Sequence, residues 1–232
     1  MPRKEPAPTR PRRKKILLVD DHPLMRRGQA DLLGREPDLV VCGEAGTARE
    51  AMDAIAKLTP DLVLVDMALP DKDGLELIKD IQTIYPGLPV LAMSMQDESL
   101  YAARVLRAGG RGYVMKAEGL ERLAPAIRTV LNGQVALSPR ISAKLIESMV
   151  GPAGTVGDGP EAKLSDRELE VLRLFGEGWS TEEIASRLHL SPKTVDVHRA
   201  HIKQKLALKT TPEFQRFAIH WVASQGGPRA SE

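Results

Sequence analysis

Short apolar runs recur along the first part of the chain, between Lys15 and about Asn132, and are separated by longer stretches with helical spacing. Apolar runs without polar alternation are typical of strands that are buried on both faces of a parallel sheet. The five predicted strands are Ile16–Val19, Leu39–Cys42, Leu62–Val65, Val90–Met93 and Gly112–Val114. Their alternation with helices predicts an α/β doubly wound five-stranded parallel sheet of about 120 residues.

The last third of the chain carries helix-start signals in place of strand-like runs. Ser165 and Ser180 each begin a capping box, in which a glutamate follows the serine three residues later. Ser191 and Thr211 each place a capping hydroxyl before a proline at the first helical position. Four helix starts within about 50 residues predict a compact all-α four-helix domain.

Composition and charge refine the domain organisation. Hydrophobic residues make up 42% of the chain, and no apolar stretch approaches the roughly 18 residues that span a bilayer, so we expect a cytoplasmic protein without membrane contact. Residues 14–133 carry 15 Lys/Arg against 18 Asp/Glu, whereas residues 163–232 carry 11 against 9. The single cysteine, Cys42, lies in an apolar run and is expected to be buried. We expect a disordered basic arm (1–13), the α/β domain (14–133), a linker with a short helix from Pro139 to Met149 (134–162), the helical domain (163–226) and a tail (227–232).

Polar residues follow the predicted strands at their carboxyl ends, where open α/β sheets bind ligands. Asp20 and Asp21 follow the first strand, Asp66 the third, Ser94 the fourth and Lys116 the fifth. Three converging carboxylates favour Mg²⁺ or Ca²⁺, and Mg²⁺ above all if phosphate shares the site. Lysine and serine are donors for a phosphoryl group, and a carboxylate can act as the nucleophile. A lone strand-end aspartate is more often a helix cap, but this combination indicates phosphoryl chemistry.

These residues lie in segments that resemble a known family. Residues 15–133 resemble the receiver domain of response regulators through ILLVDDHPLMRRG, DLVLVDMALPDKDGLE, LAMSMQDE and RAGGRGYVMKAE. Residues 164–226 resemble the LuxR-type helix-turn-helix domain, and the whole chain resembles two-component response regulators of the NarL/FixJ type. The matching helical positions are Leu164, Glu168, Val171, Leu172, Gly178, Ile184, Ala185, Leu188, Ser191, Thr194, Val195, His198, Ile202, Lys205 and Leu206.

The receiver resemblance implies a flavodoxin-like fold and a role for each strand-end residue. Asp66 is implied as the phosphoacceptor, and Asp20, Asp21, Asp66 and the backbone carbonyl of Ala68 as the Mg²⁺ ligands. Ser94 is expected to donate to a phosphoryl oxygen and Lys116 to pair with its charge. Tyr113 occupies the aromatic switch position that swings inward when Ser94 moves, although a half-buried core aromatic is an alternative interpretation. We expect Asp71 and Asp73 to be turn residues only.

The helix-turn-helix resemblance implies that the helix Pro192–Leu206 lies in the major groove of DNA while Thr181–Leu188 crosses the backbone. Val195, Ile202 and Leu206 are expected to point inward. Asp196, Val197 and Ala200 are the implied base-reading positions, where Asp196 could accept from cytosine and Val197 could touch a thymine methyl group. The other candidate DNA-binding residues, most of them for phosphate, are Lys193, Thr194, His201, Lys203, Gln204, Lys205 and Lys209. The last predicted helix, Pro212–Ser224, is a candidate dimer surface through Phe214, Phe217, Ala218 and Trp221, with a core position as the alternative for Trp221.

The interpretation that fits these features best is a DNA-binding transcriptional regulator rather than an enzyme. A sensor histidine kinase would phosphorylate Asp66, and this would modulate dimerisation and binding to double-stranded DNA; RNA polymerase is a further candidate partner. An aspartyl-phosphate phosphotransferase is disfavoured because Asp20 and Asp21 are adjacent rather than at alternate positions. A quorum-type small-molecule sensor is disfavoured by the acidic crevice and by the 3% aromatic content. The main alternative is a regulator of the same fold whose DNA binding is independent of phosphorylation.

Overall fold

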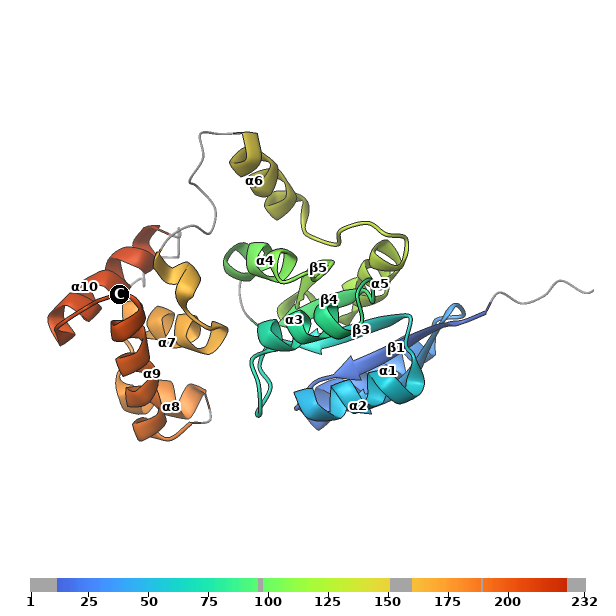
Figure 1. The fold of residues 1–232 in the computed structure, drawn as a ribbon, viewed down its shortest axis with the longest axis horizontal. Coiled ribbons are helices and arrows are strands. Elements are labelled where there is room, and N and C mark those ends of the chain that lie inside the picture. Colours follow the sequence, from blue (N-terminus) through green and yellow to red (C-terminus); the bar gives the residue numbers. More distant parts are fainter. Residues whose placement is uncertain (1–11, 96–97, 151–159, 189, 225–232) are drawn as a thin grey trace, which may run out of the picture. The chain divides into compact units, whose positions relative to one another are not determined.

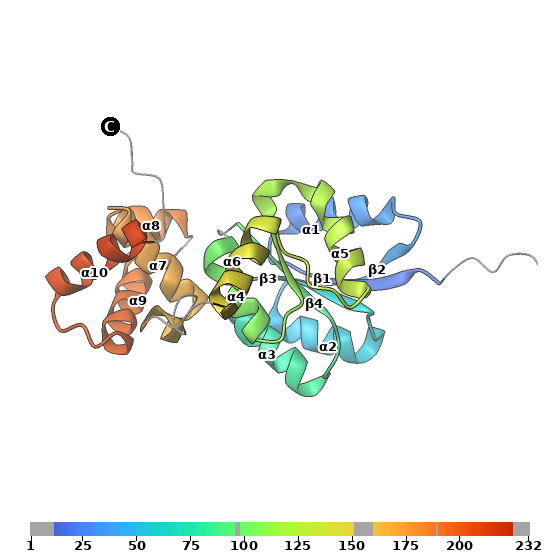
Figure 2. The same cartoon turned by 90° about the horizontal axis from the view of Figure 1, so that it is seen from above.

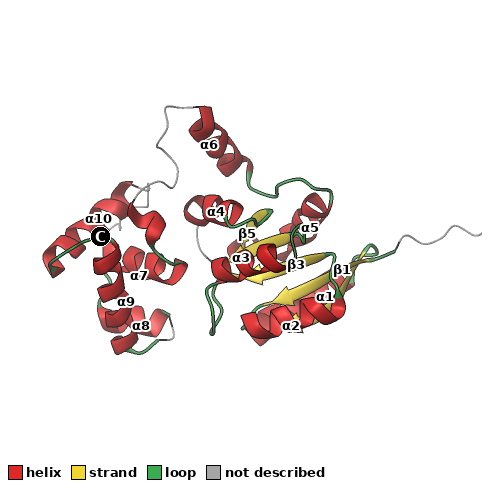
Figure 3. Cartoon of the chain, viewed as in Figure 1, coloured by secondary structure: helices red, strands yellow, loops and turns green. Residues whose placement is uncertain are grey.

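The computed structural model describes residues 12–95, 98–150, 160–188 and 190–224 (Figure 1). The predicted basic arm lies almost wholly outside these residues, as does the predicted tail. The chain forms two compact units, Met1–Lys144 and Leu145–Glu232. Figure 3 shows strands and helices in the first unit and helices alone in the described part of the second. No described helix is both long and apolar enough to cross a membrane.

The first unit is built on a five-stranded parallel sheet, as predicted. Its strands are β1 (Lys14–Val19), β2 (Leu39–Ala45), β3 (Leu62–Asp66), β4 (Val90–Ser94) and β5 (Gly112–Met115), in the order β2-β1-β3-β4-β5. The strands extend beyond the predicted runs, so that Asp66 and Ser94 are the last residues of β3 and β4. Strand β2 lies at an edge and is only half-buried along most of its length, including Cys42. The expectation of full burial was therefore wrong for this strand.

Helices cover both faces of the sheet (Figure 2). Helices α1 (Pro23–Gly34) and α5 (Leu123–Leu131) lie on one face, and α2 (Ala48–Leu58), α3 (Gly74–Ile84) and α4 (Glu98–Arg107) lie on the other. Alternate residues of each strand pack against the two helical layers, because successive side chains of a strand point to opposite faces of the sheet. The core beneath α1 and α5 contains Ile16, Leu18, Leu33, Leu39, Leu62, Leu64, Leu91, Met93, Val114, Leu123, Ala124, Ile127, Val130 and Ala136.

The segment between α5 and the next helix, α6 (Pro139–Val150), runs along the free edge of β5. The amide of Tyr113 donates to the carbonyl of Ala136 at 2.9 Å, and the amide of Ala136 donates to the carbonyl of Arg111 at 3.0 Å. Gly112 permits this approach, since a Cβ there would stand 2.5 Å from the Ala136 carbonyl oxygen. We call residues 134–138 the β5 strap.

The second unit contains the four predicted helices, α7 (Asp166–Gly176), α8 (Thr181–Arg187), α9 (Pro192–Lys205) and α10 (Thr211–Ser224), after the short 3-10 helix η3 (Pro160–Lys163). The capping boxes at Ser165 and Ser180 are both formed, and Ser191 caps α9 through the Thr194 amide. The predicted caps of α7, α8 and α9 are therefore confirmed. The prediction was wrong by one residue for α10, which begins at Thr211 and is capped by Thr210, whose Oγ1 accepts from the Glu213 amide at 3.3 Å.

Helix α10 packs its aromatic face inward, which corrects one expectation. Phe214, Ala218 and Trp221 are buried, and the Phe214 ring meets the Phe175 ring edge-on with centroids 5.2 Å apart. These three residues belong to the core of the unit, so the assignment to a dimer surface was wrong for Phe214 and Ala218, and the alternative of a core position is confirmed for Trp221. Phe217 is half-buried, and its place in a dimer surface stays a prediction. Ile219 is a large apolar residue of α10 that is exposed, on the other side of the helix.

Candidate functional site

The acidic residues that end β1 and β3 come together as predicted. Asp20, Asp21, His22 and Asp66 each offer a ligand atom, and these atoms all lie within 4.8 Å of one another. Asp20 and Asp66 are almost completely buried, at 0% and 2% exposure. Burying like charges this close together is unfavourable unless positive charge lies beside them.

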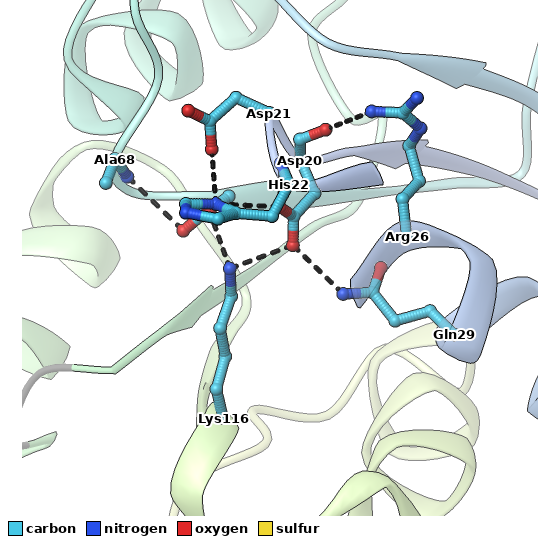
Figure 4. A network of polar contacts seen from close by, with 8 residues as sticks. Asp20, Asp21, His22, Arg26, Gln29, Ala68 and Lys116 are labelled. Carbon is cyan, nitrogen blue, oxygen red and sulfur yellow. Dashed lines mark hydrogen bonds and ion pairs between the residues drawn. The ribbon is translucent and has the colours of Figure 1, made fainter. Parts of the chain in front are cut away.

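Lys116 supplies positive charge from the end of β5, where it begins the 3-10 helix η1 (Lys116–Glu118). Its Nζ lies 2.8 Å from Asp20 Oδ2 and 2.6 Å from Asp66 Oδ2, and its side chain is only 5% exposed (Figure 4). These charge-assisted hydrogen bonds join three strand ends in one site, and the carboxylates raise the pKa of the lysine despite its burial.

One lysine does not fully compensate the acidic cluster. Burial raises the pKa of Asp66 to about 6; the charge of Lys116 opposes this shift and the nearby Asp20 adds to it. Asp21 adds a third carboxylate, whose Oδ1 lies 2.6 Å from His22 Nδ1. Three carboxylates that share one buried lysine, one of them an acid that resists ionisation, fit a divalent cation with oxygen ligands.

Contacts from α1 hold Asp20 in place. The His22 amide donates to Asp20 Oδ1 at 2.9 Å, and Gln29 Nε2 donates to Asp20 Oδ2 at 3.1 Å. Arg26 donates to the Asp20 backbone carbonyl at 2.6 Å (Figure 4). His22 occupies the N-cap position of α1 without a side-chain capping hydrogen bond, and Pro23 takes the first helical position.

The remaining predicted site residues surround this cluster. Ser94 is buried at the end of β4, and Tyr113 is 3% exposed in β5, more deeply buried than the half-buried aromatic we considered. The Ala68 amide donates to Asp66 Oδ1 at 3.3 Å, while the role of the Ala68 carbonyl as a ligand stays a prediction. Asp71 and Asp73 have structural contacts: Asp71 accepts from two amides at the start of α2, and Asp73 caps α3.

The predicted DNA-reading helix, α9, separates its core face from its polar face as expected. Val195 and Ile202 are buried and Leu206, just after the helix, is half-buried. Most of the candidate DNA-binding residues are exposed: Lys193, Asp196, Val197, Ala200, His201, Gln204, Lys205 and Lys209. Thr194 and Lys203 are half-buried.

Lys205 and Asp196 of α9 form ion pairs that were not foreseen, and His201 Nδ1 lies 3.9 Å from Glu168 Oε1. Lys205 Nζ lies 2.6 Å from Glu168 Oε2, a buried carboxylate of α7 that also accepts from the Ser165 amide. Asp196 pairs with Arg199 at 2.8 Å, and the Arg199 guanidinium lies 5.7 Å from the centre of the Phe175 ring. Lys205 and Asp196, both predicted DNA contacts, therefore already have partners within the unit.

Sequence reasoning overlooked His22, Gln29 and the ion-pairing role of Glu168. His22 directly follows the two aspartates, a signal that could have been read. Glu168 was noted as a capping-box and family position, but its pairing with Lys205 joins residues 37 apart. Gln29 carries no local signal, because only the packing of α1 against β1 brings its amide to Asp20.

Comparison with known proteins agrees with this geometry. Residues 16–128 match the response regulator receiver domain, and residues 162–218 match the bacterial regulatory proteins of the luxR family. The oxygen regulatory protein NreC of Staphylococcus carnosus is 34% identical over 209 residues, which cover 88% of this chain and 96% of that protein.

Solved structures with a similar fold include two response regulators. A LuxR-family two-component response regulator from Aurantimonas has 35% identity and a TM-score of 0.56, over 60% of this chain and 99% of that chain. RcsB of Salmonella enterica serovar Typhimurium, bound to the rprA promoter with the phosphomimetic BeF₃⁻, has 27% identity and a TM-score of 0.56. The match covers 89% of this chain and 98% of that chain.

The fold, the lysine-paired acidic site and the capped helix-turn-helix define a two-component response regulator. The chain belongs to the family that joins a receiver domain to a LuxR-type helix-turn-helix, the group that includes NreC. It is accordingly a DNA-binding transcription regulator, and its family is not a class of enzymes.

Proposed function

We propose that a sensor histidine kinase phosphorylates Asp66 and that this controls the binding of the C-terminal unit to double-stranded DNA. The observation that carries the proposal is the position of Lys116, whose ammonium bridges Asp66 and Asp20 inside a buried acidic cluster. Among ordinary structural aspartates, such a fully desolvated arrangement is unusual, and strongly perturbed carboxylates of this kind favour a functional site.

The chemistry follows from the side chains at the site. An Asp66 oxygen attacks the phosphorus of a phosphohistidine; the new O–P bond forms as the P–N bond breaks, and the imidazole leaves with a proton. Lys116 then pairs with the phosphoryl charge, and the Ser94 hydroxyl donates to a phosphoryl oxygen. Mg²⁺, which receiver domains typically bind, would be held by Asp20, Asp21, Asp66 and the Ala68 carbonyl, and would neutralise charge on the incoming group.

The β5 strap supports a route from this site to the rest of the chain. Its Ala136 is hydrogen-bonded to Tyr113, the predicted switch residue, and the Ser138 amide donates to Glu98 Oε1 on α4 at 2.7 Å. Ser138 Oγ in turn accepts from the Ile141 amide at the start of α6. We infer that rearrangement of Ser94, Tyr113 and α4 changes the anchorage of α6. Glu98→Ala, which removes the acceptor of the Ser138 amide, should then leave phosphoryl uptake intact and reduce the gain in DNA affinity on phosphorylation. An unchanged gain would remove the strap from the mechanism.

In the proposed DNA complex, α9 lies in the major groove. Lys193, Lys203 and Lys209 contact phosphates, which positions the unit, while Val197 and Ala200 face base edges. Because Asp196 repels phosphate and Lys205 is paired with Glu168, a single unit has modest affinity. Binding as a homodimer in the cytoplasm, with RNA polymerase as a candidate partner, completes the proposal.

Intact mass after incubation with acetyl phosphate and Mg²⁺ tests the acceptor, with Asp66→Ala as the comparison. We expect one added phosphoryl group on the native chain and none on the variant, followed by a rise in DNA affinity for the phosphorylated form only. Uptake without a change in affinity would favour the alternative of phosphorylation-independent DNA binding. No uptake from acetyl phosphate or from a kinase donor would contradict the proposed acceptor.

A further inference from the structure

Gln29 is a buried glutamine on the face of α1 that packs against the sheet. Its side chain is 0% exposed, and its Nε2 lies 3.1 Å from Asp20 Oδ2 (Figure 4). The orientation of the amide is fixed chemically, because an ionised carboxylate only accepts hydrogen bonds and so must face the nitrogen.

Packing alone does not account for an amide at this position. Gln29 Oε1 is buried without a hydrogen-bond partner in the part of the chain that the structure describes. An unpaired buried carbonyl is unfavourable, whereas a leucine would fill the same layer without one, as Leu33 does one turn later. The hydrogen bond to Asp20 is the contact that distinguishes glutamine from an aliphatic residue here.

The hydrogen bond from Gln29 matters because Lys116, the other side-chain donor to Asp20 Oδ2, also donates to Asp66. Asp20 Oδ2 accepts from both Gln29 and Lys116, while Oδ1 accepts from the His22 amide. If Lys116 turns toward a phosphoryl group on Asp66, Gln29 still holds Oδ2 in place. Each carboxylate oxygen accepts about two hydrogen bonds, so Oδ1, which accepts from the His22 amide and lies 3.5 Å from His22 Nδ1, keeps an acceptor position that a cation could use.

We propose that Gln29 is a positioning residue of the cation site, which holds the Asp20 carboxylate in the orientation that binds Mg²⁺ whatever the position of Lys116. The inference rests on the proposed function in one respect, namely that Asp20 is a cation ligand. Hydrogen-bonding partners of metal ligands commonly change metal affinity about tenfold or more when they are removed.

The experiment compares Gln29→Leu with the native full-length chain. Calorimetric titration with Mg²⁺ alone should give a dissociation constant about tenfold higher for the variant. Phosphoryl uptake from acetyl phosphate should need a correspondingly higher Mg²⁺ concentration for half-maximal rate, with the maximal rate unchanged, because Asp66 and Lys116 are intact. A merely structural residue would lower the melting temperature without moving either Mg²⁺ dependence.

Gln82→Leu is the matched control. Gln82 lies on α3, away from the acidic site, and its side chain donates to the Leu88 carbonyl beyond the end of the helix. Its Mg²⁺ affinity should equal that of the native chain. Native-like Mg²⁺ affinity in Gln29→Leu, or an equal loss in both variants, would overturn the proposal. If Gln29→Leu does not fold, Gln29→Met is held to the same criteria. A native chain that binds Mg²⁺ but takes up no phosphoryl group would contradict the proposed function and leave this comparison of affinities intact.

Discussion

The acidic site of the receiver and the outer face of α9 are polar surfaces built in opposite ways. At the acidic site the charged atoms are buried, and His22, Gln29 and Lys116 supply hydrogen bonds to Asp20. On α9 most of the candidate DNA-binding side chains are exposed to solvent. A site for a small ion and a phosphoryl group is pre-organised by the hydrogen bonds of the protein, whereas a DNA-binding surface exposes its hydrogen-bond donors to the phosphates and bases of the DNA.

This difference predicts how substitutions will behave. Changes at the acidic site should alter folding stability together with ligand binding, because buried charges there depend on one another. Changes on the α9 face should alter DNA binding alone, since exposed substitutions rarely shift stability by more than about 0.5 kcal/mol. Both tryptophans, Trp179 and Trp221, lie in the helical unit, so their fluorescence follows its unfolding while circular dichroism also follows the receiver.

The largest effect is expected for Lys116→Ala. Removing the buried ammonium leaves Asp20 and Asp66 uncompensated, which should lower the free energy of unfolding by about 3–5 kcal/mol without metal. Urea unfolding at neutral pH measures this loss, and added Mg²⁺ should recover part of it. Lys72→Ala is the control, because the Lys72–Asp80 pair is exposed and should contribute about 0.5 kcal/mol. Equal losses in the two variants would erase the contrast between buried and exposed charge.

The pH dependence of the free energy of unfolding should report the raised pKa of Asp66. Its folded pKa of about 6 lies above the ordinary value of 3.8, so the folded state holds the proton more tightly. The resulting stabilisation is fully present below about pH 4 and is lost as pH rises through about 6, by at most about 3 kcal/mol. The difference between the native chain and Asp66→Asn, measured by urea unfolding without metal, should follow this course. A difference that is independent of pH would show that Asp66 ionises normally.

A smaller loss is expected for Glu168→Gln in the helical unit. Its carboxylate completes the capping box of α7 and pairs with Lys205, and these contacts lower its pKa although burial opposes them. Its contribution is therefore present above the unfolded pKa and is lost as pH falls through the lower folded value. We expect the variant to lose about 1–2 kcal/mol at neutral pH by tryptophan fluorescence. Glu183→Gln, in the exposed capping box of α8, should lose less stability. A larger loss there would contradict the stronger stabilisation that we assign to Glu168.

The smallest effect on stability is expected for Gln204→Lys on the exposed face of α9. One further phosphate contact should steepen the dependence of log affinity on log salt by about 0.9 and leave unfolding unchanged. Filter binding or anisotropy at several salt concentrations measures the slope. Ala223→Lys adds the same charge on α10 and serves as the control. If both lysines steepen the slope equally, the effect is one of net charge rather than of α9.

The sequence predicted those parts of the molecule that have a local signal. Apolar runs located the five strands, and the carboxyl ends of β1, β3, β4 and β5 located the acidic site. Serine caps located α7, α8 and α9. Asp66, Ser94 and Lys116 followed from strand ends alone, because parallel strands bring those ends to one edge.

Features that depend on tertiary packing could not be predicted in this way. The apolar stripe of Phe214, Ala218 and Trp221 marks a buried face of α10, but a sequence does not say whether α7 or a second copy covers it. The Gln29–Asp20 and Glu168–Lys205 contacts join residues whose side chains meet only after the helices pack. Strand β2 extends to Ala45, and its register against β1 shifts between Ile16 and Leu17. No residue type in the sequence signals such a backbone irregularity.

The β5 strap has a consequence for self-association. A sheet ends in two strands whose outer amides and carbonyls can template pairing with another chain, the starting point of domain swapping and aggregation. At β5 the Arg111 carbonyl and the Tyr113 amide both pair with Ala136, so this part of the edge is closed to a foreign strand. Because Gly112 allows that coverage, a larger residue there would both detach the strap and open the edge to β-augmentation by another chain.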